Sequence, residues 1–242
     1  MDLNDKVAVV TGASSGIGKS IAEELSKKGC KVALASRSLD KLKEIGKGLS
    51  QSFEVEMDVS QNESVTDAFE KIYDRFGQID ILVNCAGVMP LTYLKNRKLD
   101  DWLQTIEVNV KGTLRCIHAV LPMMKKQKSG HIINIASVDG KEIFEGGAVY
   151  GASKAAVIEL SRAMRMELSP DFNIRVTSIE PGTVATDLRE DITDEELLEY
   201  KNYGNGESKL DPKNIADAVL YATNQPDNVN VNELLIKPTG KS

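Results

Sequence analysis

Short apolar runs alternate along the chain with longer stretches in which apolar residues recur at helical spacing. The short runs are rich in β-branched residues and continuously apolar, which is typical of strands buried on both faces of a sheet. They predict strands at Lys6–Val10, Lys31–Ala35, Phe53–Met57, Ile79–Val83, His131–Ala136, Ile174–Ile179 and Glu233–Ile236.

The longer stretches have the period of amphipathic helices. They predict helices at Ile17–Lys28, Leu39–Leu49, Glu63–Phe76, Leu99–Lys126, Val149–Leu168 and Pro212–Thr223. Buried strands that alternate with helices form right-handed βαβ crossovers. We therefore expect an α/β protein with a doubly wound Rossmann fold, in which a seven-stranded parallel sheet carries helices on both faces. Because no linker or repeat interrupts this alternation, residues 1–242 are predicted to form a single domain.

Composition and charge narrow the classes of function. The 242 residues carry a net charge of −6, without the basic excess of a nucleic-acid-binding surface. No apolar run approaches the roughly 18 residues of a membrane-spanning helix, and the first residues do not resemble a signal peptide. The cysteines are widely spaced and the histidines isolated, so neither a disulfide framework nor a metal site is expected. We expect a cytoplasmic protein that binds no nucleic acid, membrane or metal.

A glycine-rich turn, Thr11–Gly18, follows the first predicted strand and opens the first helix. Backbone N–H groups at a helix N-terminus favour an anion such as the pyrophosphate of a dinucleotide. Gly12 permits the sharp turn, Gly16 lets the ligand approach the backbone, and Gly18 lets the helix pack on the strand. The cofactor contacts expected in this turn are Gly12, Ser14, Ser15, Gly16, Ile17 and Gly18.

The end of the second strand predicts which dinucleotide is bound. An acidic residue there would bind the adenosine ribose and repel a 2′-phosphate, but the chain has Ser36-Arg37-Ser38. The guanidinium of Arg37 and the helix start at Ser38 suit a phosphate dianion. We therefore expect NADP(H) to be preferred over NAD(H), the alternative being that Arg37 is an ordinary solvent-exposed side chain.

Four polar residues suggest acid–base chemistry. Tyr150 and Lys154 share one face of a predicted helix, and an ammonium beside a phenol lowers the phenol's pKa from its usual value near 10. Ser137 follows the fifth strand at the edge where doubly wound sheets bind ligands. Asn109 lies inside the long helix Leu99–Lys126. There it is a candidate catalytic residue or a buried amide bound to the backbone, and the two roles are compatible.

Together these motifs resemble the short-chain dehydrogenase/reductase family from the first strand to the last. Besides the glycine turn, the family's motifs are matched by Asn84-Cys85-Ala86-Gly87, Pro181-Gly182 and Asp58-Val59. The catalytic tetrad of the family is matched by Asn109, Ser137, Tyr150 and Lys154. Cys85 stands where the family has a second Asn, and Ser15 where many NADP-preferring relatives have a basic residue, so the cofactor prediction rests mainly on Arg37.

The resemblance implies a mechanism in which hydride passes between the nicotinamide and a carbonyl or carbinol carbon. Tyr150 would be the general acid/base and Ser137 would bind the substrate oxygen, so both are expected to contact substrate. Lys154 would lower the pKa of Tyr150 and bind the nicotinamide ribose, and Asn109 would position a water for a proton relay. The resemblance also implies that Tyr150 and Lys154 contact the cofactor. The remaining contacts implied are Asp58, Val59, Asn84, Ala86, Gly87, Pro181, Gly182, Val184 and Thr186.

A small carbonyl compound or secondary alcohol is the expected substrate, and Met89–Tyr93 and Val138–Gly147 are candidate pocket segments. Lys141, Arg189 and Lys201 are candidates for binding a carboxylate. The acidic segment Asp187–Lys209 is either a solvated surface helix and turn or a mobile lid. The helices Leu99–Lys126 and Val149–Leu168 carry more apolar residues than one sheet contact would cover, and the family pairs these helices. We therefore expect a homo-oligomer, either a dimer or a homotetramer.

Two other functions are compatible with a nucleotide-binding fold. A regulatory sensor could bind NADP without turnover, but it could dispense with the four polar residues that this chain has. A sugar-nucleotide epimerase or dehydratase usually has TGxxGxxG and a further substrate domain, neither of which is present. An oxidoreductase remains the expected function.

Overall fold

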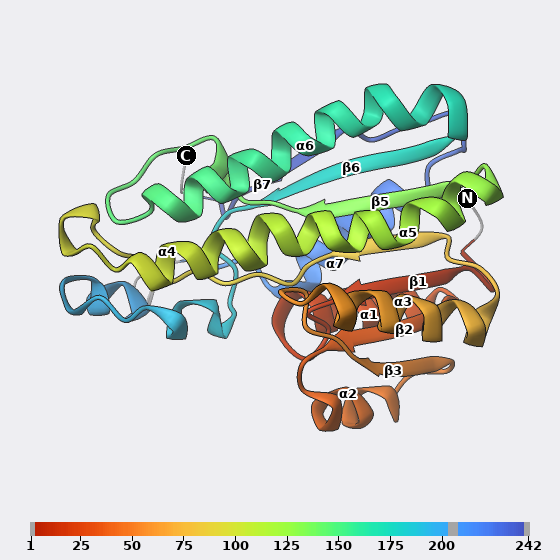
Figure 1. Cartoon of the computed structure of the whole chain (residues 1–242), viewed down its shortest axis with the longest axis horizontal. Helices are drawn as coiled ribbons and strands as arrows, with labels where there is room; N and C mark the ends of the chain where they lie inside the picture. Colours follow the sequence, from red (N-terminus) through yellow and green to blue (C-terminus); the bar gives the residue numbers. More distant parts are fainter. Residues whose placement is uncertain (1–2, 203–207, 240–242) are drawn as a thin grey trace.

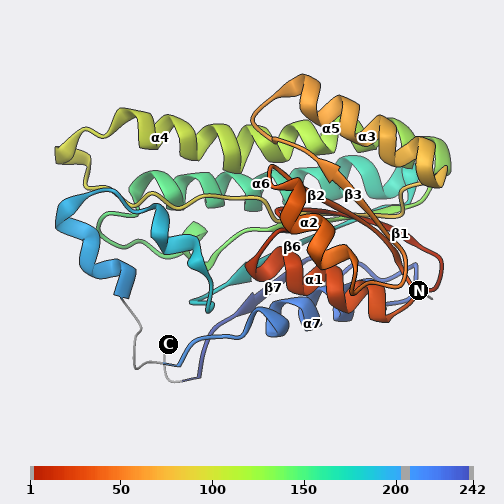
Figure 2. The same ribbon diagram turned by 90° about the horizontal axis from the view of Figure 1, so that it is seen from below.

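A single parallel sheet lies between two layers of helices in the computed structural model, which describes residues 3–202 and 208–239 (Figures 1 and 2). The strands are β1 (Val7–Thr11), β2 (Lys31–Ser36), β3 (Ser52–Glu56), β4 (Ile81–Asn84), β5 (Gly130–Ile135), β6 (Ile174–Pro181) and β7 (Glu233–Ile236). Their order in the sheet is β3-β2-β1-β4-β5-β6-β7. The chain reverses its direction of progress between β1 and β4, and sheets of this kind bind ligands at that point.

The helices cover both faces of the sheet (Figure 2). They are α1 (Gly16–Lys27), α2 (Leu39–Gly46), α3 (Asn62–Phe76), α4 (Leu99–Ile106), α5 (Thr113–Gln127), α6 (Ala148–Phe172) and α7 (Pro212–Thr223). One face packs on α1, α2 and α7, and the other packs on α3, α5 and α6. The predicted doubly wound Rossmann fold is therefore confirmed.

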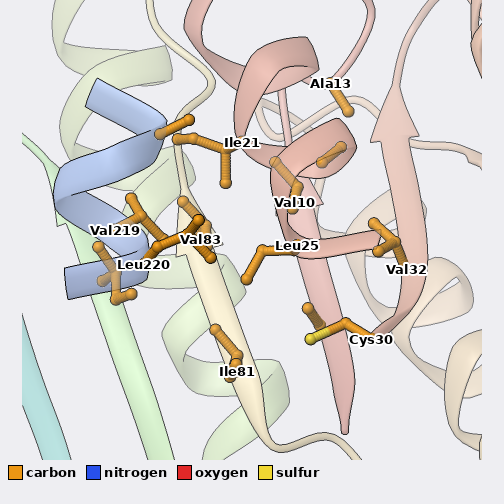
Figure 3. Close-up of a cluster of buried hydrophobic side chains, with 14 of the residues drawn as sticks. Val10, Ala13, Ile21, Leu25, Cys30, Val32, Ile81, Val83, Val219 and Leu220 are labelled. Carbon is orange, nitrogen blue, oxygen red and sulfur yellow. The ribbon is translucent and has the colours of Figure 1, made fainter. Parts of the chain in front are cut away.

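The core explains why the strands are apolar throughout. Val10 and Val83 pack with Ile21 of α1 and Val219 of α7 in one cluster (Figure 3). Val9, which precedes Val10 in the same strand, belongs to the cluster on the opposite face. Successive side chains of a strand point to opposite faces, so a strand between two helix layers needs apolar residues at every position.

Several element boundaries differ from those predicted. The fourth strand begins at Ile81 instead of Ile79, because the Ile79 N–H donates to the Gln127 side chain (3.1 Å) and does not join the sheet. The sixth strand continues to Pro181, which pairs with Ile236 of β7. Helix α6 continues past Leu168 to Phe172 and ends at Asn173, which has a left-handed φ of 52°.

The predicted helix Leu99–Lys126 is interrupted by a π-helical turn, η2 (Glu107–Gly112), between α4 and α5. Such turns widen the helix and recur at functional sites. The turn contains Asn109, so its geometry bears directly on the site described below.

The acidic segment after β6, predicted to be a solvated surface helix and turn or a mobile lid, forms two short 3₁₀ helices, η4 (Asp187–Asp191) and η5 (Glu195–Asn202). Ile192 and Leu197 are buried against Met89, Leu91 and Tyr150. This part of the segment thus forms an apolar wall beside Tyr150. Residues 203–207, part of the possible lid, lie outside the described residues, and so does the side chain of Lys201.

Within the two described ranges, no helix combines the length and apolarity needed to cross a membrane. The same ranges hold no group of three or more His, Cys, Asp or Glu residues that could bind a metal ion. His131 is fully buried in β5, and its Nε2 lies 2.8 Å from Thr177 Oγ1. Cys30, Cys85 and Cys116 are free thiols.

Candidate active site

The turn between β1 and α1 has a backbone that only glycine fits. Gly12 and Gly16 have φ values of 66° and 49°, a region that residues with a Cβ rarely adopt. A Cβ on Gly12 would lie 2.9 Å from Ala86 Cα, and one on Gly18 would lie 2.4 Å from Gly12 O. Thr11 Oγ1 accepts the N–H groups of Cys85 (2.9 Å) and Ala86 (3.0 Å), which ties this turn to the end of β4.

A cavity of about 1240 Å³ opens at the carboxyl ends of the strands, above this turn. This volume exceeds the range of about 300–1,000 Å³ that is usual for ligand pockets, so it can hold a dinucleotide together with a small substrate. The predicted site residues that line it are Gly12, Ser14, Ser15, Gly16, Ile17, Gly18, Arg37, Ser38, Asp58, Val59, Ala86, Gly87, Ser137, Tyr150, Lys154, Pro181, Gly182, Val184 and Thr186.

Two predicted residues do not line the cavity. Asn84 is buried in the sheet, where its Nδ2 donates to Asn134 Oδ1 (2.8 Å). This hydrogen bond joins β4 to β5, and a cofactor contact of Asn84 stays a prediction. Asn109 is also buried, but it borders the site through Gly87, on which a Cβ would lie 3.3 Å from Asn109 Oδ1 and 3.6 Å from Lys154 Nζ.

Asn109 makes three hydrogen bonds from the π-helical turn. Its Oδ1 accepts the N–H of Val88 (2.9 Å), and its Nδ2 donates to Val88 O (3.0 Å) and Ser153 Oγ (3.1 Å). Both the oxygen and the nitrogen of this buried amide are hydrogen-bonded, as expected for a buried amide bound to the backbone. The contacts also join the chain after β4 to α6, which carries Tyr150, so Asn109 positions the elements around the site.

The end of the cavity beside α2 contains two basic side chains. Arg37 and Lys41 both line it and are exposed, and neither forms an ion pair within the described part of the chain. Ser36 Oγ accepts the N–H of Ser38 (3.1 Å) at the start of α2. Lys41 was missed by the sequence analysis, although its position four residues after Arg37 in the first turn of a helix could have indicated it.

Ser137, Tyr150 and Lys154 come together at the other end of the cavity. The Ser137 hydroxyl accepts the N–H of Asp139 (3.1 Å) and donates to Pro181 O (3.5 Å). Lys154 Nζ donates to Ile135 O (2.9 Å) and lies 5.8 Å from the centre of the Tyr150 ring. All three side chains are buried apart from their openings onto the cavity.

The electrostatics of this group differ from the prediction. Burial is the main cause that raises the pKa of Tyr150 above its usual value, and the charge of Asp139 raises it further. The Ser137 hydrogen bond and Arg189 lower it, whereas Lys154 is not among the groups that shift this pKa. Burial lowers the pKa of Lys154 to about 8. The chain therefore holds Tyr150 as a neutral phenol, a proton donor, at neutral pH.

Asp139 is a further residue of the cavity that the sequence analysis missed. It is the second residue after Ser137, and burial raises the pKa of its carboxyl group. The only sequence signal was its position in Val138–Gly147, one of the candidate pocket segments.

Comparison with known proteins agrees with this geometry. A family profile described as "short chain dehydrogenase" matches residues 6–197. An uncharacterized oxidoreductase of Staphylococcus saprophyticus is 46% identical over 98% of this chain and 99% of its own length.

Two solved structures have the same fold over almost the whole chain. A serine dehydrogenase in a closed form complexed with NADP+ is 32% identical, with a TM-score of 0.90 over 98% of this chain and 96% of its own. An alcohol dehydrogenase from the archaeon Thermococcus sibiricus, complexed with 5-hydroxy-NADP, is 31% identical, with a TM-score of 0.87 over 99% of both chains. The chain therefore belongs to the short-chain dehydrogenase/reductase family of oxidoreductases.

Proposed function

We propose that the protein is an NADP(H)-dependent oxidoreductase that interconverts a small carbonyl compound and the corresponding secondary alcohol. The observation that carries the proposal is the shared cavity, in which Ser137, Tyr150 and Lys154 face the same space as the glycine turn of α1. The glycine backbone and the N-terminus of α1 fit a dinucleotide pyrophosphate. A bound nicotinamide dinucleotide would supply or accept the hydride.

In the reducing direction, Tyr150 donates its phenolic proton to the substrate oxygen. Its raised pKa keeps the proton in place until negative charge develops on that oxygen. Ser137 hydrogen-bonds the same oxygen and stabilises the charge, as a donor in an oxyanion hole does. Ser137 follows β5 and Tyr150 lies in the first turn of α6, so both are held by elements of the core.

Lys154 and Asn109 complete the group. With a pKa of about 8, the Lys154 amine is charged at neutral pH. It is thus able to bind the ribose hydroxyls of a nucleotide and to support the phenolate that remains after proton transfer. Asn109 holds Val88 and Ser153, and in this proposal its contacts also position the water that returns a proton to the site.

The preference for NADP(H) rests on Arg37 and Lys41. Two cations without ion-pair partners in the described chain, next to the N-terminus of α2, suit a 2′-phosphate dianion. The NADP+ and 5-hydroxy-NADP in the two related structures support this preference.

The proposal is tested by calorimetric titration with NADPH and NADH, followed by a screen of small ketones and secondary alcohols. We expect NADPH to bind more tightly and Arg37→Ala to weaken NADPH binding while leaving NADH binding unchanged. Tighter NADH binding, or an Arg37→Ala variant with undiminished NADPH affinity, would reject the preference. Tight NADPH binding without turnover of any compound would favour the sensor function instead.

We also propose that the protein self-associates through α4 and α5. Leu99 and Leu103 lie one helical turn apart and are 55% and 59% exposed, and Leu114 of α5 is 43% exposed. Apolar side chains gathered on one helix surface mark an interaction site. Sedimentation should give a dimer or tetramer that Leu103→Glu dissociates, whereas a monomeric wild-type protein would contradict the proposal.

A cytoplasmic location is proposed as well, because Cys30, Cys85 and Cys116 are free. Burial raises the pKa of each thiol to about 12, and free thiols are usual in reducing compartments. Cell fractionation with an antibody to the protein tests this, and recovery from the extracellular fraction would contradict it.

A further inference from the structure

Asp139 stands beside the reacting groups without a role in the proposed mechanism. Its N–H donates to Ser137 Oγ (3.1 Å), and Asp139 lines the cavity that Ser137 and Tyr150 also line. The backbone carbonyl oxygen of Asp139 would lie 2.8 Å from a Cβ on Gly151, so the turn that carries Asp139 is packed directly on the first turns of α6. Asp139 is therefore held at the catalytic end of the cavity by its packed backbone.

Asp139 differs from the neighbouring carboxylates in having no cation. Glu142 lies 2.6 Å from Lys237 Nζ, and Glu180 lies 2.7 Å from Lys141 Nζ. Within residues 3–202 and 208–239, no ion pair includes Asp139, although it is half-buried. Arg189 and Lys154 act on its pKa only through longer-range charge interactions. A half-buried carboxylate costs free energy unless a charge or hydrogen bonds compensate it, so this position favours a cation.

The charge of Asp139 couples it to the catalytic tyrosine. The Ser137 hydroxyl, which accepts the Asp139 N–H (3.1 Å), donates to Pro181 O (3.5 Å) and leaves the carboxylate without that donor. The charge of Asp139 raises the pKa of Tyr150. A cation that binds Asp139 would compensate this charge.

Resting on the proposed function, we infer that Asp139 binds a protonated amine of the substrate and that the preferred substrates are vicinal amino alcohols and the corresponding amino ketones. The amine would sit on the carbon next to the reacting carbon, since Asp139 is next to Ser137, which binds the reacting oxygen. The binding of the ammonium also removes the negative charge that raises the pKa of Tyr150, and so assists deprotonation of the alcohol.

The reaction itself balances as an ordinary alcohol oxidation. With 3-aminobutan-2-ol, the carbinol C–H and O–H bonds break, NADP+ takes the hydrogen with two electrons, and the phenolate form of Tyr150 takes the proton. The product is 3-aminobutan-2-one. The ammonium group is unchanged, so Asp139 acts in binding and charge compensation only.

A matched set of alcohols tests the inference: 3-aminobutan-2-ol, butan-2-ol and 3-hydroxybutanoate, which share the secondary alcohol and differ in charge. A hydrogen-bonded charge pair of this kind corresponds to about a 10- to 100-fold effect on kcat/KM. We expect the wild-type protein to prefer the amino alcohol by about that factor, Asp139→Asn to abolish the preference, and Asp139→Glu to retain part of it. Glu145→Gln removes an equal charge from an exposed position in the same loop and should change nothing.

Butan-2-ol is the uncharged reference for each protein. Because the charge of Asp139 also acts on the pKa of Tyr150, Asp139→Asn changes the turnover of both alcohols, and the ratio of their kcat/KM values isolates the amine site. An unchanged ratio of amino alcohol to butan-2-ol in Asp139→Asn would overturn the inference, as would a wild-type preference for 3-hydroxybutanoate. Calorimetry with butan-2-amine and the NADPH-loaded protein gives a readout independent of turnover. Binding that Asp139→Asn abolishes supports the amine site even if no alcohol is oxidised, and that result would count against the proposed reaction alone. Equal binding to both proteins overturns the amine site.

Discussion

The strand that leads to Ser137 carries a buried histidine whose titration should limit the stability of the whole sheet. Burial is the main cause that lowers the pKa of His131 to about 3, and the charge of Arg175 lowers it further. Thr177 Oγ1 donates to Val231 O (2.7 Å), so it accepts a hydrogen bond from the N–H of His131 Nε2. Within the described residues Nδ1 has no partner, so a second proton on the ring would be buried without an acceptor.

This arrangement predicts the direction in which the free energy of unfolding changes with pH. The unfolded chain, with a histidine pKa of about 6.5, binds a proton at pH values where the folded chain does not. Stability from this residue is therefore fully present above about pH 6.5 and falls as the pH decreases toward about 3. Between about pH 7.5 and about pH 5, the loss amounts to about 2 kcal/mol. For a chain of this size that loss corresponds to about 4–8 °C in Tm.

The assay compares the wild-type protein with His131→Gln by thermal unfolding over this pH range. Carboxylates titrate in both proteins, so their contributions cancel in the difference between the two curves. We expect the stability of His131→Gln to fall by about 2 kcal/mol less than that of the wild-type protein. Parallel curves would refute the reasoning, because they would mean that His131 has the same pKa in the folded and unfolded states.

Two further predictions follow from the packing. Gly18→Ala should destabilise the protein by about 1–3 kcal/mol and weaken NADPH binding, because its Cβ would lie 2.4 Å from Gly12 O. Gly48→Ala is the control, because its Cβ would meet nothing nearer than 3.5 Å. Equal effects of the two substitutions in calorimetry would contradict the account. Lys141→Met should cost about 3 kcal/mol in urea unfolding because it leaves the fully buried Glu180 without its cation, and Glu180→Gln should recover part of this loss. Lys237→Met breaks the more exposed ion pair with Glu142 and should cost less than about 1 kcal/mol. A loss as large as that of Lys141→Met would contradict the expected difference between the buried and the exposed ion pair.

The fold was predictable because strand and helix periods are local properties of the sequence. The apolar runs around Val9 and Val10 predicted a strand buried on both faces, and the two core clusters show it. The end of a strand depends on its neighbours instead: Ile79 leaves the sheet because Gln127 of α5 takes its N–H. The π-helical turn at Asn109 likewise depends on contacts with Val88 and Ser153, which no local pattern indicates.

In the candidate site, too, the local features were predictable and the features that depend on neighbouring elements were not. Glycine spacing and the Tyr150–Lys154 pair placed the main groups in one cavity, since helix and turn geometry fix their relation. Their electrostatics could not be read in this way, because a pKa depends on three-dimensional burial. In the chain alone, burial and the charge of Asp139 raise the pKa of Tyr150, and an effect of Lys154 on that pKa stays a prediction. Asp139 itself was overlooked because its importance comes from what surrounds it.

The central claim is that the phenol of Tyr150 transfers the substrate proton, and a single-turnover measurement tests it most directly. Wild-type protein and Tyr150→Phe are loaded with NADPH, mixed with a ketone that the wild-type protein reduces, and followed by NADPH absorbance. The account predicts unchanged NADPH affinity and a rate that falls about 10²–10⁴-fold in Tyr150→Phe, the usual contribution of general acid catalysis. A variant that binds NADPH normally and reduces the ketone at the wild-type rate would contradict it.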